Sequence, residues 1–488
     1  MAKRKINKNF YKFLSFILII LTVISSGFLI YFDVIPQKYL IILLLLLFAV
    51  VLFITYKLNS RNNLFTKIAC SVVSIILIIG EIGGIFYANG TMDFFSIIND
   101  NGYVYENYGI YVPSTSTIKN VKELKKETIV AFFENESSQK LALNKLESYI
   151  KYEISKNQND AIKNTLDGKY KGIFINKTLM DIYTEENPDS FKLISSYEIK
   201  QKNESEFNFI NVTKEPFVVY LSGIDSYGKV NKSARSDVNL LAVVNPKSGK
   251  ILLVTTPRDY YVTLYSKKVK DKLTHAGIYG IEESAKTLGL LYDVDVNYYA
   301  RVNFTSFVNI IDELNGVTVN VEKPDYNINL GVDCLGMVCE QNSKREFGTK
   351  MIYIKPGKQT LSGEEALSYV RNRHQYKDGD NARGRHQSEV LKALAEKAMS
   401  PSVLTKYNSL LNALSGGVRT NMDQKTVTKL IKYQLDKNIN WTIENIAATG
   451  TDSYNLCYST GRAKAYVMEP NLESINTIKD KIKETMNV

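Results

Sequence analysis

Four arginines lie close together in the stretch VRNRHQYKDGDNARGRHQSEV, which runs from residue 370 to residue 390: Arg371, Arg373, Arg383 and Arg385. An arginine side chain carries a permanent charge and offers only hydrogen-bond donors. Such a cluster therefore either contacts an anion or lies in water as a basic surface. If it contacts an anion, phosphate fits well, because the forked guanidinium matches two phosphate oxygens at once.

Three runs rich in β-branched residues predict strands upstream of this cluster: FVVYLSGID, VNLLAVVNP and KILLVTTPRD. The turn signal NPKSGK joins the last two. In an antiparallel meander, the end of the first strand, the start of the second and the end of the third lie at one edge of the sheet. Asp225, Asp237 and Arg258 occupy these positions. The meander would therefore bring two carboxylates and a guanidinium together.

Helices are expected to carry the clustered arginines. The segment SGEEALSYVRNR has helical spacing, but Arg371 and Arg373 are two residues apart and cannot share a helical face. Either the helix ends there or only one of them points into a site. A last helix, near residues 380–399, places Arg383 and Gln387 one turn apart on one face.

Carboxylates together with arginines indicate the kind of ligand. Carboxylate oxygens bind hard cations such as Mg²⁺ or Mn²⁺, and arginines bind phosphate oxygens. The combination favours a diphosphate bridged by magnesium. The chain has only three histidines, which argues against a histidine-rich zinc site.

Three other patterns invite a chemical interpretation. GIDSYGKV (223–230) nearly matches a phosphate-binding P-loop, but Val230 stands where a Ser or Thr would ligate magnesium. SYGK matches the Ser-x-x-Lys of penicillin-binding proteins, whose nucleophile opens a helix, whereas Ser226 follows a strand. His275 could be a general base, but a structural role is the favoured interpretation.

The N-terminal region predicts three membrane spans, at residues 13–32, 39–56 and 68–88. Basic residues precede the first span and separate the second from the third, whereas only Lys38 lies between the first two. The positive-inside rule then predicts a cytoplasmic tail (1–12), spans within 13–90 and an extracytoplasmic remainder. The chain is therefore expected in the cytoplasmic membrane, and the arginine cluster is not expected to meet nucleic acid.

The remainder divides in two. Residues 98–210 alternate short apolar strands with polar helices, which predicts a small α/β accessory domain, and YEIKQKNESEFNFINVTKEP (197–216) is interpreted as its exit linker. A larger α/β domain is expected over 216–488. In it, Cys334 and Cys339 could form a disulfide or stay as buried thiols.

Several ordered motifs resemble the LytR–CpsA–Psr family: LSGIDSYG, ARSDVNLLAVVNPKSGKILLVTTPRDYYV, DKLTHAGIYG, YYARVNFTSFVNIIDELNGVTVNV, LSGEEALSYVRNRHQ and DNARGRHQ. The likeness is firm over residues 216–400 and loose beyond. Three spans and an interposed accessory domain are similar to capsule-associated members. The resemblance implies a membrane-anchored α/β/α sandwich with a central mixed sheet and a hydrophobic groove for a polyprenyl tail. The insert NINLGVDCLGMVCEQNSKREFGTK (327–350) departs from the family and could lie over the groove entrance.

The resemblance also implies a function and a set of site residues. Family members transfer an anionic glycopolymer, capsular polysaccharide or wall teichoic acid, from a polyprenyl-diphosphate carrier to peptidoglycan in Gram-positive bacteria. Asp225 and Asp237 match the magnesium ligands. The diphosphate-contacting positions are matched by Arg258, Lys272, Arg371, Arg373, Arg383 and Gln387. Those expected to act in catalysis are Asp225, Asp237, Arg258, Arg371 and Arg373.

Two alternatives remain open at the level of the sequence. Hydrolysis instead of transfer would make the protein a polyprenyl-diphosphate phosphatase. A protein that only binds lipid phosphate could regulate capsule synthesis by contacting the capsule-synthesis proteins. Arg385 matches the family motif without an evident role.

Overall fold

The computed structural model describes nine segments of the chain, and the structural statements below concern these residues: 8–33, 35–98, 103–202, 207–224, 234–342, 350–398, 406–414, 417–461 and 464–487. The chain forms two compact units. One comprises Met1–Ser96 and Asp423–Asn440, and the other comprises Ile97–Met422 and Trp441–Val488.

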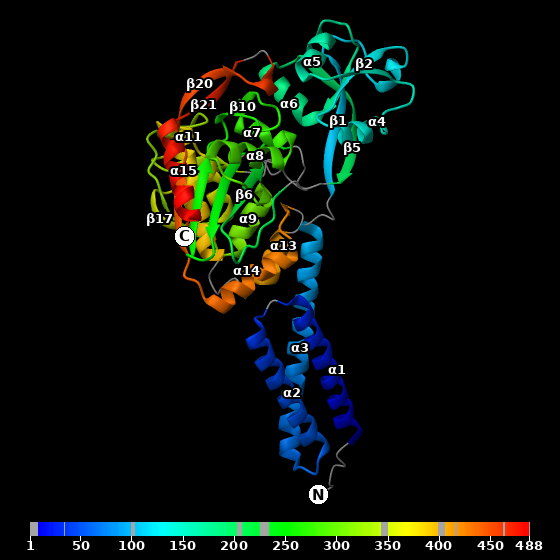
Figure 1. The fold of residues 1–488 in the computed structure, drawn as a ribbon, viewed down its shortest axis with the longest axis vertical. Coiled ribbons are helices and arrows are strands. Elements are labelled where there is room, and N and C mark those ends of the chain that lie inside the picture. Colours follow the sequence, from blue (N-terminus) through cyan, green and yellow to red (C-terminus); the bar gives the residue numbers. More distant parts are fainter. Residues whose placement is uncertain are drawn as a thin grey trace. The chain divides into compact units, whose positions relative to one another are not determined.

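The first unit contains three long apolar helices (Figure 1): α1 (Lys8–Phe32), α2 (Gln37–Asn59) and α3 (Leu64–Ile98). Each contains a 23-residue stretch that is long and apolar enough to cross a bilayer. The three predicted spans all fall within these helices. The same unit includes helix α14 (Gln424–Lys437).

The accessory region of the second unit is built around a five-stranded mixed sheet in the order β3-β2-β4-β1-β5. Its strands are β1 (Tyr103–Pro113), β2 (Thr128–Phe132), β3 (Lys151–Ser155), β4 (Ile173–Asn176) and β5 (Phe191–Lys202). Helices cover the sheet: α4 (Glu136–Leu143), α5 (Gln158–Leu166) and α6 (Lys177–Glu186). The predicted α/β character of residues 98–210 is seen here.

The linker interpretation of residues 197–216 is wrong for its first part. Residues up to Lys202 belong to strand β5, which pairs with β1 along its whole length. β5 is the outer strand of this sheet, and an outer strand tolerates polar and charged side chains. The polar composition of this stretch therefore reflects an edge strand rather than a linker.

The larger α/β region, expected over residues 216–488, contains a six-stranded sheet in the order β18-β11-β6-β7-β8-β19. Its strands are β6 (Phe217–Ile224), β7 (Val238–Asn245), β8 (Lys250–Thr256), β11 (Tyr298–Asn303), β18 (Val418–Thr420) and β19 (Thr442–Ala447). β6, β7 and β8 form the predicted antiparallel meander, whereas β11 and β19 join it in parallel. The sheet is therefore mixed, as expected.

Helices cover both faces of this sheet, which gives the predicted α/β/α sandwich. One face packs Tyr220, Leu241 and Val254 against α8 (Ile281–Tyr292) and α15 (Leu472–Met486). The opposite face packs Leu240 and Leu253 against α11 (Asp380–Ala398). Alternate residues of a strand point to opposite faces, so neighbours such as Leu240 and Leu241 belong to different cores. Two further helices, α9 (Phe304–Glu313) and α10 (Gly363–Arg371), pack together with α11.

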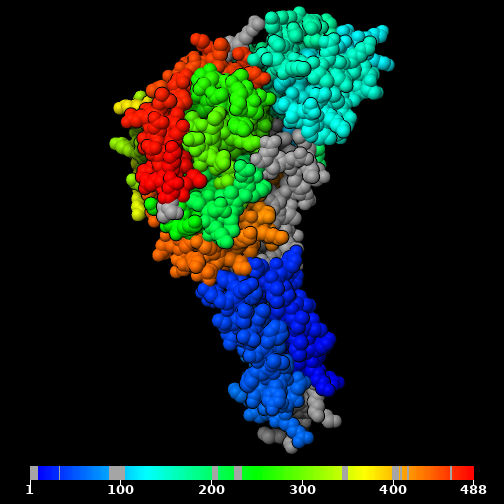
Figure 2. All heavy atoms as spheres, viewed as in Figure 1, coloured from blue at the N-terminus to red at the C-terminus, as the bar shows by residue number. Residues whose placement is uncertain are grey.

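The accessory region and the larger α/β region pack directly against each other within the second unit (Figure 2). Ile278 of the larger region is buried in the core of the accessory region. An ion pair joins Arg235 Nη1 to Glu185 Oε2 at 2.6 Å. An apolar contact and an ion pair thus join the two regions.

Candidate active site

A cavity of about 360 Å³ lies beside β6 and β11 and the helices α9, α10 and α11. Its wall is partly polar and partly apolar. The polar part includes Asp237, Arg258, Arg371, Arg373, Arg383 and Gln387. The apolar part includes Leu221, Val302, Phe304, Phe307, Leu391 and Leu394. Such a wall matches an amphipathic ligand that has both an anionic group and a hydrocarbon chain.

The meander brings Asp237 and Arg258 together, as the strand pattern predicts. The backbone N–H of Asp237 donates to Gly223 O at 2.7 Å, which fixes it beside the end of β6. Arg258 follows β8 and donates from Nη1 to Asp237 Oδ1 at 2.8 Å. Asp225, the third member of the predicted group, lies outside the described residues.

Helix α10 ends at Arg371, which resolves how two arginines two positions apart can serve one site. Asn372 follows with an extended backbone (φ −68°, ψ 129°), so the chain leaves the helix there. Arg371 and Arg373 consequently both line the cavity. The guanidinium of Arg371 also lies over the Phe304 ring, 5.6 Å from its centroid.

Arg383 and Gln387 come from α11 and line the cavity on one face of that helix, as predicted. Arg385 points elsewhere. Its side chain is 45% exposed and forms ion pairs with Glu322 and Asp378. The structure thus separates Arg385 from the other three arginines of the opening cluster.

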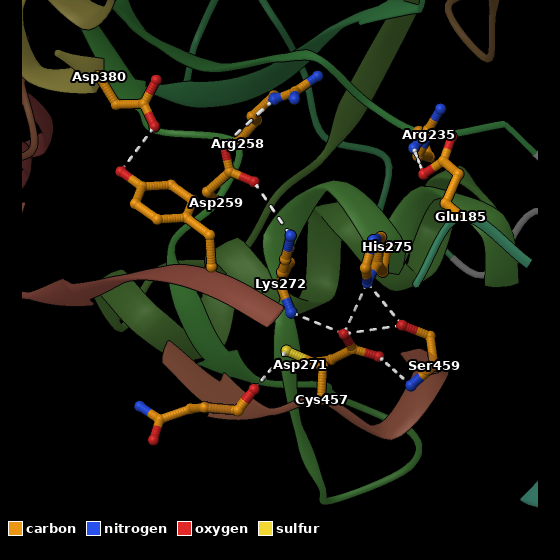
Figure 3. A network of polar contacts seen from close by, with 12 residues as sticks. Glu185, Arg235, Arg258, Asp259, Asp271, Lys272, His275, Asp380, Cys457 and Ser459 are labelled. Atoms are coloured by element: carbon orange, nitrogen blue, oxygen red, sulfur yellow. Dashed lines mark hydrogen bonds and ion pairs between the residues drawn. The ribbon is translucent and has the colours of Figure 1, made fainter. Parts of the chain in front are cut away.

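Asp259 is a buried carboxylate at the centre of the cations, and the strand and motif patterns did not single it out. It is 2% exposed. Arg258 Nε lies 3.2 Å and Arg383 Nη2 3.3 Å from its Oδ2. Arg373 Nη1 at 3.8 Å and Lys272 Nζ at 3.7 Å complete the group. Figure 3 shows Lys272 reaching towards Asp259.

A second buried carboxylate, Asp380, also holds two of the arginines. Its Oδ1 lies 2.8 Å from Arg383 Nη2 and 3.3 Å from Arg373 Nη1. Asp380 opens α11 three residues before Arg383, a spacing at which helical side chains meet. That spacing is a signal the sequence contains. Asp259, by contrast, is marked only by its place next to Arg258.

The cations determine the charge state of this cluster. Burial opposes ionisation of Asp259, but the charge of Arg258, with smaller effects of Arg383, Lys272 and Arg373, holds the pKa of its carboxyl well below its usual range. Asp259 is therefore a fixed negative charge at neutral pH. It orders Arg258, Arg373 and Arg383, which line the cavity.

Lys272 reaches the cluster through Asp259 but does not line the cavity itself. Its neighbour Asp271 is fully buried and contacts His275 Nδ1 at 2.8 Å. Ser459 Oγ contacts the same ring nitrogen at 2.6 Å (Figure 3). A Ser-His-Asp triad needs the serine and the aspartate on different ring nitrogens. His275 is therefore structural, and it fixes the segment that carries Lys272.

Cys334 and Cys339 form a disulfide, the first of the two states considered from the sequence. The loop that they close is hydrogen-bonded to the segment that directly follows α10. Asn372 Nδ2 donates to Cys339 O, and the N–H of Cys339 donates to Gln375 Oε1, both at 2.8 Å. Asn372 and Gln375 are fully buried. The disulfide loop thus supports the backbone that presents Arg371 and Arg373.

The insert also contributes directly to the cavity. Leu330 and Glu340 are part of its wall. Glu340 Oε2 accepts a hydrogen bond from Asn329 Nδ2 at 3.2 Å, which holds the carboxylate in place. Part of the insert therefore lies at the cavity, and its position over the groove entrance stays a prediction.

Asp237 is the predicted ligand of a divalent cation that lies among the described residues. In the described part of the chain, no group of three or more His, Cys, Asp or Glu side chains is arranged to hold a metal ion. Magnesium requires about six oxygens, and one carboxylate supplies at most two of them. Asp237 suits a cation only if Asp225, ligand oxygens and water complete the shell.

Comparison with known proteins assigns the chain to a family. The model of the LytR_cpsA_psr family matches residues 182–483, more than half of the chain. The chain belongs to the LytR_cpsA_psr family. The predicted family and fold class are thereby confirmed.

Named relatives in this family are transferases. TagT of Bacillus subtilis (strain 168), a polyisoprenyl-teichoic acid–peptidoglycan teichoic acid transferase, is 32% identical over 279 residues, which is 56% of this chain and 78% of TagT. TagU of Bacillus cereus, named for the same activity, is 31% identical over 47% of this chain and 67% of TagU. A solved structure described as TagT with bound octaprenyl pyrophosphate lipid is 28% identical, with a TM-score of 0.41, and covers 58% of this chain and 95% of that one. The predicted enzyme class, a transferase, is confirmed by these relatives.

Proposed function

We propose that this LytR_cpsA_psr member transfers an anionic glycopolymer from a polyprenyl-diphosphate carrier to peptidoglycan. The cavity carries this proposal, because an apolar wall there adjoins a cluster of arginines held in place by buried aspartates. The polyprenyl chain would lie against residues such as Phe304 and Leu391. The diphosphate would lie against the arginines.

The reaction needs neutralisation of charge more than covalent help from the protein. A hydroxyl group of peptidoglycan attacks the phosphorus that carries the glycopolymer. A new oxygen–phosphorus bond forms, the bond to the bridging oxygen breaks, and polyprenyl monophosphate leaves with the bridging oxygen, while the hydroxyl proton passes to solvent. Arg258, Arg371 and Arg373 would stabilise the charge that develops on the phosphate oxygens, assisted by Arg383 and Gln387. Lys272 would act through its ion pair with Asp259.

Asp237 would hold Mg²⁺ or Mn²⁺ together with Asp225. When bound, such a cation supplies further neutralisation of the diphosphate oxygens. The choice between capsular polysaccharide and wall teichoic acid depends on the donor, and the named relatives favour teichoic acid.

The proposal is tested with defined substrates. The protein is incubated with a polyprenyl-diphosphate oligosaccharide and peptidoglycan fragments, and the products are analysed by mass spectrometry. A polymer–peptidoglycan conjugate supports transfer. Free phosphorylated sugar would instead indicate that the protein hydrolyses the donor. Unchanged donor would favour a regulator that only binds lipid phosphate.

Magnesium or manganese is expected to bind tightly only together with a diphosphate, because the protein supplies an incomplete shell. Isothermal calorimetry on the full-length protein in detergent, with and without a polyprenyl diphosphate, measures this dependence. The Asp225→Ala, Asp237→Ala double variant should lose the metal binding that depends on the diphosphate. Tight metal binding without ligand would contradict the shared site.

We further propose that the N-terminus is cytoplasmic and that both folded regions of the second unit are extracytoplasmic. The distribution of basic residues around the three apolar helices supports this orientation. In intact cells, an impermeant thiol reagent should label Lys163→Cys, which is exposed on α5, but label Arg61→Cys, between α2 and α3, only after lysis. The unchanged protein gives the background from native cysteines, and the reverse pattern would overturn the orientation.

A further inference from the structure

Helix α14 belongs to the same compact unit as the membrane-spanning helices, although about 330 residues separate it from them in the sequence. Two ion pairs tie it to the short connection between α1 and α2. Lys432 Nζ lies 2.7 Å from Asp33 Oδ1, and Lys38 Nζ lies 2.6 Å from Asp436 Oδ1. Asp33 follows the end of α1, and Lys38 is the second residue of α2. Because both helices are long enough to span, their connection marks one surface of the bilayer.

The side chains of α14 are divided between two faces. Ile431 and Leu435 lie one turn apart and are 37% and 48% exposed. Lys425, Lys429 and Lys437 are exposed as well, and on a helical projection they lie away from the face of Ile431 and Leu435. A helix with an apolar face and a lysine-rich polar face is typical of segments that lie in the interface plane of a membrane.

The residues that flank α14 also indicate a position at a membrane surface. The single tryptophan of the chain, Trp441, lies in the short connection between α14 and β19. Tryptophan is enriched where membrane meets water. Moreover, α14 connects β18 to β19, the two outer strands of the sheet beside which the cavity lies. A helix docked on the bilayer would therefore restrain both edges of that sheet.

We propose that α14 is an interfacial helix that docks on the outer leaflet, with Ile431 and Leu435 among the lipids and its lysines near anionic headgroups. The ion pairs with the α1–α2 connection place it at the membrane surface, and the charge of its polar face matches anionic lipid. The side of the membrane rests on the orientation proposed above. Docking would add a membrane contact to those that the three apolar helices make.

The native Trp441 allows a direct test in the full-length protein. The protein is reconstituted in liposomes that contain lipids brominated either near the headgroup or near the end of the acyl chain, and tryptophan fluorescence is recorded. Shallow bromines are expected to quench Trp441 more strongly than deep ones. This measurement needs no activity, so its outcome is independent of whether polymer transfer is observed.

Matched variants separate docking by α14 from simple proximity to the membrane. The Ile431→Ser, Leu435→Ser double variant should lose most of the shallow quenching. The control, Leu290→Ser with Leu472→Ser, removes two apolar residues that are 50% and 73% exposed on α8 and α15 and should keep it. Absent quenching in the unchanged protein, or equal quenching in the first double variant, would overturn the proposal.

The role of the lysines is tested by lipid composition and does not depend on the folding of a variant. Replacing anionic phosphatidylglycerol with zwitterionic phosphatidylcholine should weaken the shallow quenching, and so should high salt. Equal quenching in the two lipid mixtures would overturn the assignment of anionic headgroups as the partner of the polar face.

Discussion

Replacing Asp259 with asparagine is expected to lower both the stability and the activity of the protein strongly. The substitution keeps the shape of the side chain but removes the charge that Arg258, Arg373, Arg383 and Lys272 share. Removing one partner of a buried ion pair typically costs about 3–5 kcal/mol, since the other charge is left uncompensated. The melting temperature and the transfer rate of Asp259→Asn should therefore both fall well below those of the unchanged protein.

The role of Asp259 as a positioning residue gives this prediction a specific signature. A diphosphate can supply the missing negative charge, so a polyprenyl diphosphate should raise the melting temperature of Asp259→Asn more than that of the unchanged protein. A merely structural defect would not respond in this way. Asp378→Asn is the matched control, because Asp378 pairs with Arg385 at the surface and such pairs contribute little. Stability and transfer of Asp259→Asn close to those of the control would contradict the assignment.

The loss of stability in Asp259→Asn is expected to depend on pH. The pKa of Asp259 is lowered in the folded protein, so its stabilising effect is present above the ordinary aspartate range. It is lost only as the pH falls towards the lowered pKa. The difference in melting temperature between the unchanged protein and Asp259→Asn should therefore persist from neutral to mildly acidic pH and shrink only in strong acid.

The sequence was sufficient for the part of the site that depends on local order. Strand runs and their turn placed Asp237 beside Arg258, because an antiparallel meander has only one way to arrange its edges. Helical spacing placed Arg383 and Gln387 on one face. It also allowed the helix to end at Arg371, which it does.

The sequence was not sufficient for contacts between distant segments. Asp259 is 124 residues from Arg383, and the strand and helix patterns alone do not indicate that the end of β8 meets α11. Residues 197–202 were misjudged because an edge strand and a linker have similar polar compositions. The pairing of α14 with the α1–α2 connection joins residues 399 positions apart, and it too appears only in the fold.

Lysine substitutions are expected to distinguish the arginines of the opening stretch from one another. Arg371→Lys, Arg373→Lys and Arg383→Lys keep the charge but replace a forked donor with a point charge. Losing one charge-assisted hydrogen bond costs about 1.5–3 kcal/mol, which corresponds to a fall in transfer rate of roughly ten- to a hundredfold.

Arg383→Lys should show the largest loss of the three. Arg383 Nη2 contacts both Asp259 and Asp380, and the side chain is 8% exposed. A lysine ammonium is compact, so it cannot span these two carboxylates and still donate to a phosphate oxygen.

Arg385→Lys is the internal control, because Arg385 is 45% exposed and pairs with Glu322 and Asp378 outside the cavity. Rates are compared at matched protein levels, with melting temperatures measured for each variant. If all four lysine variants transferred polymer like the unchanged protein, the cluster would be a solvated basic surface and the active site would lie elsewhere. A loss confined to the three cavity arginines is the result that a diphosphate clamp requires.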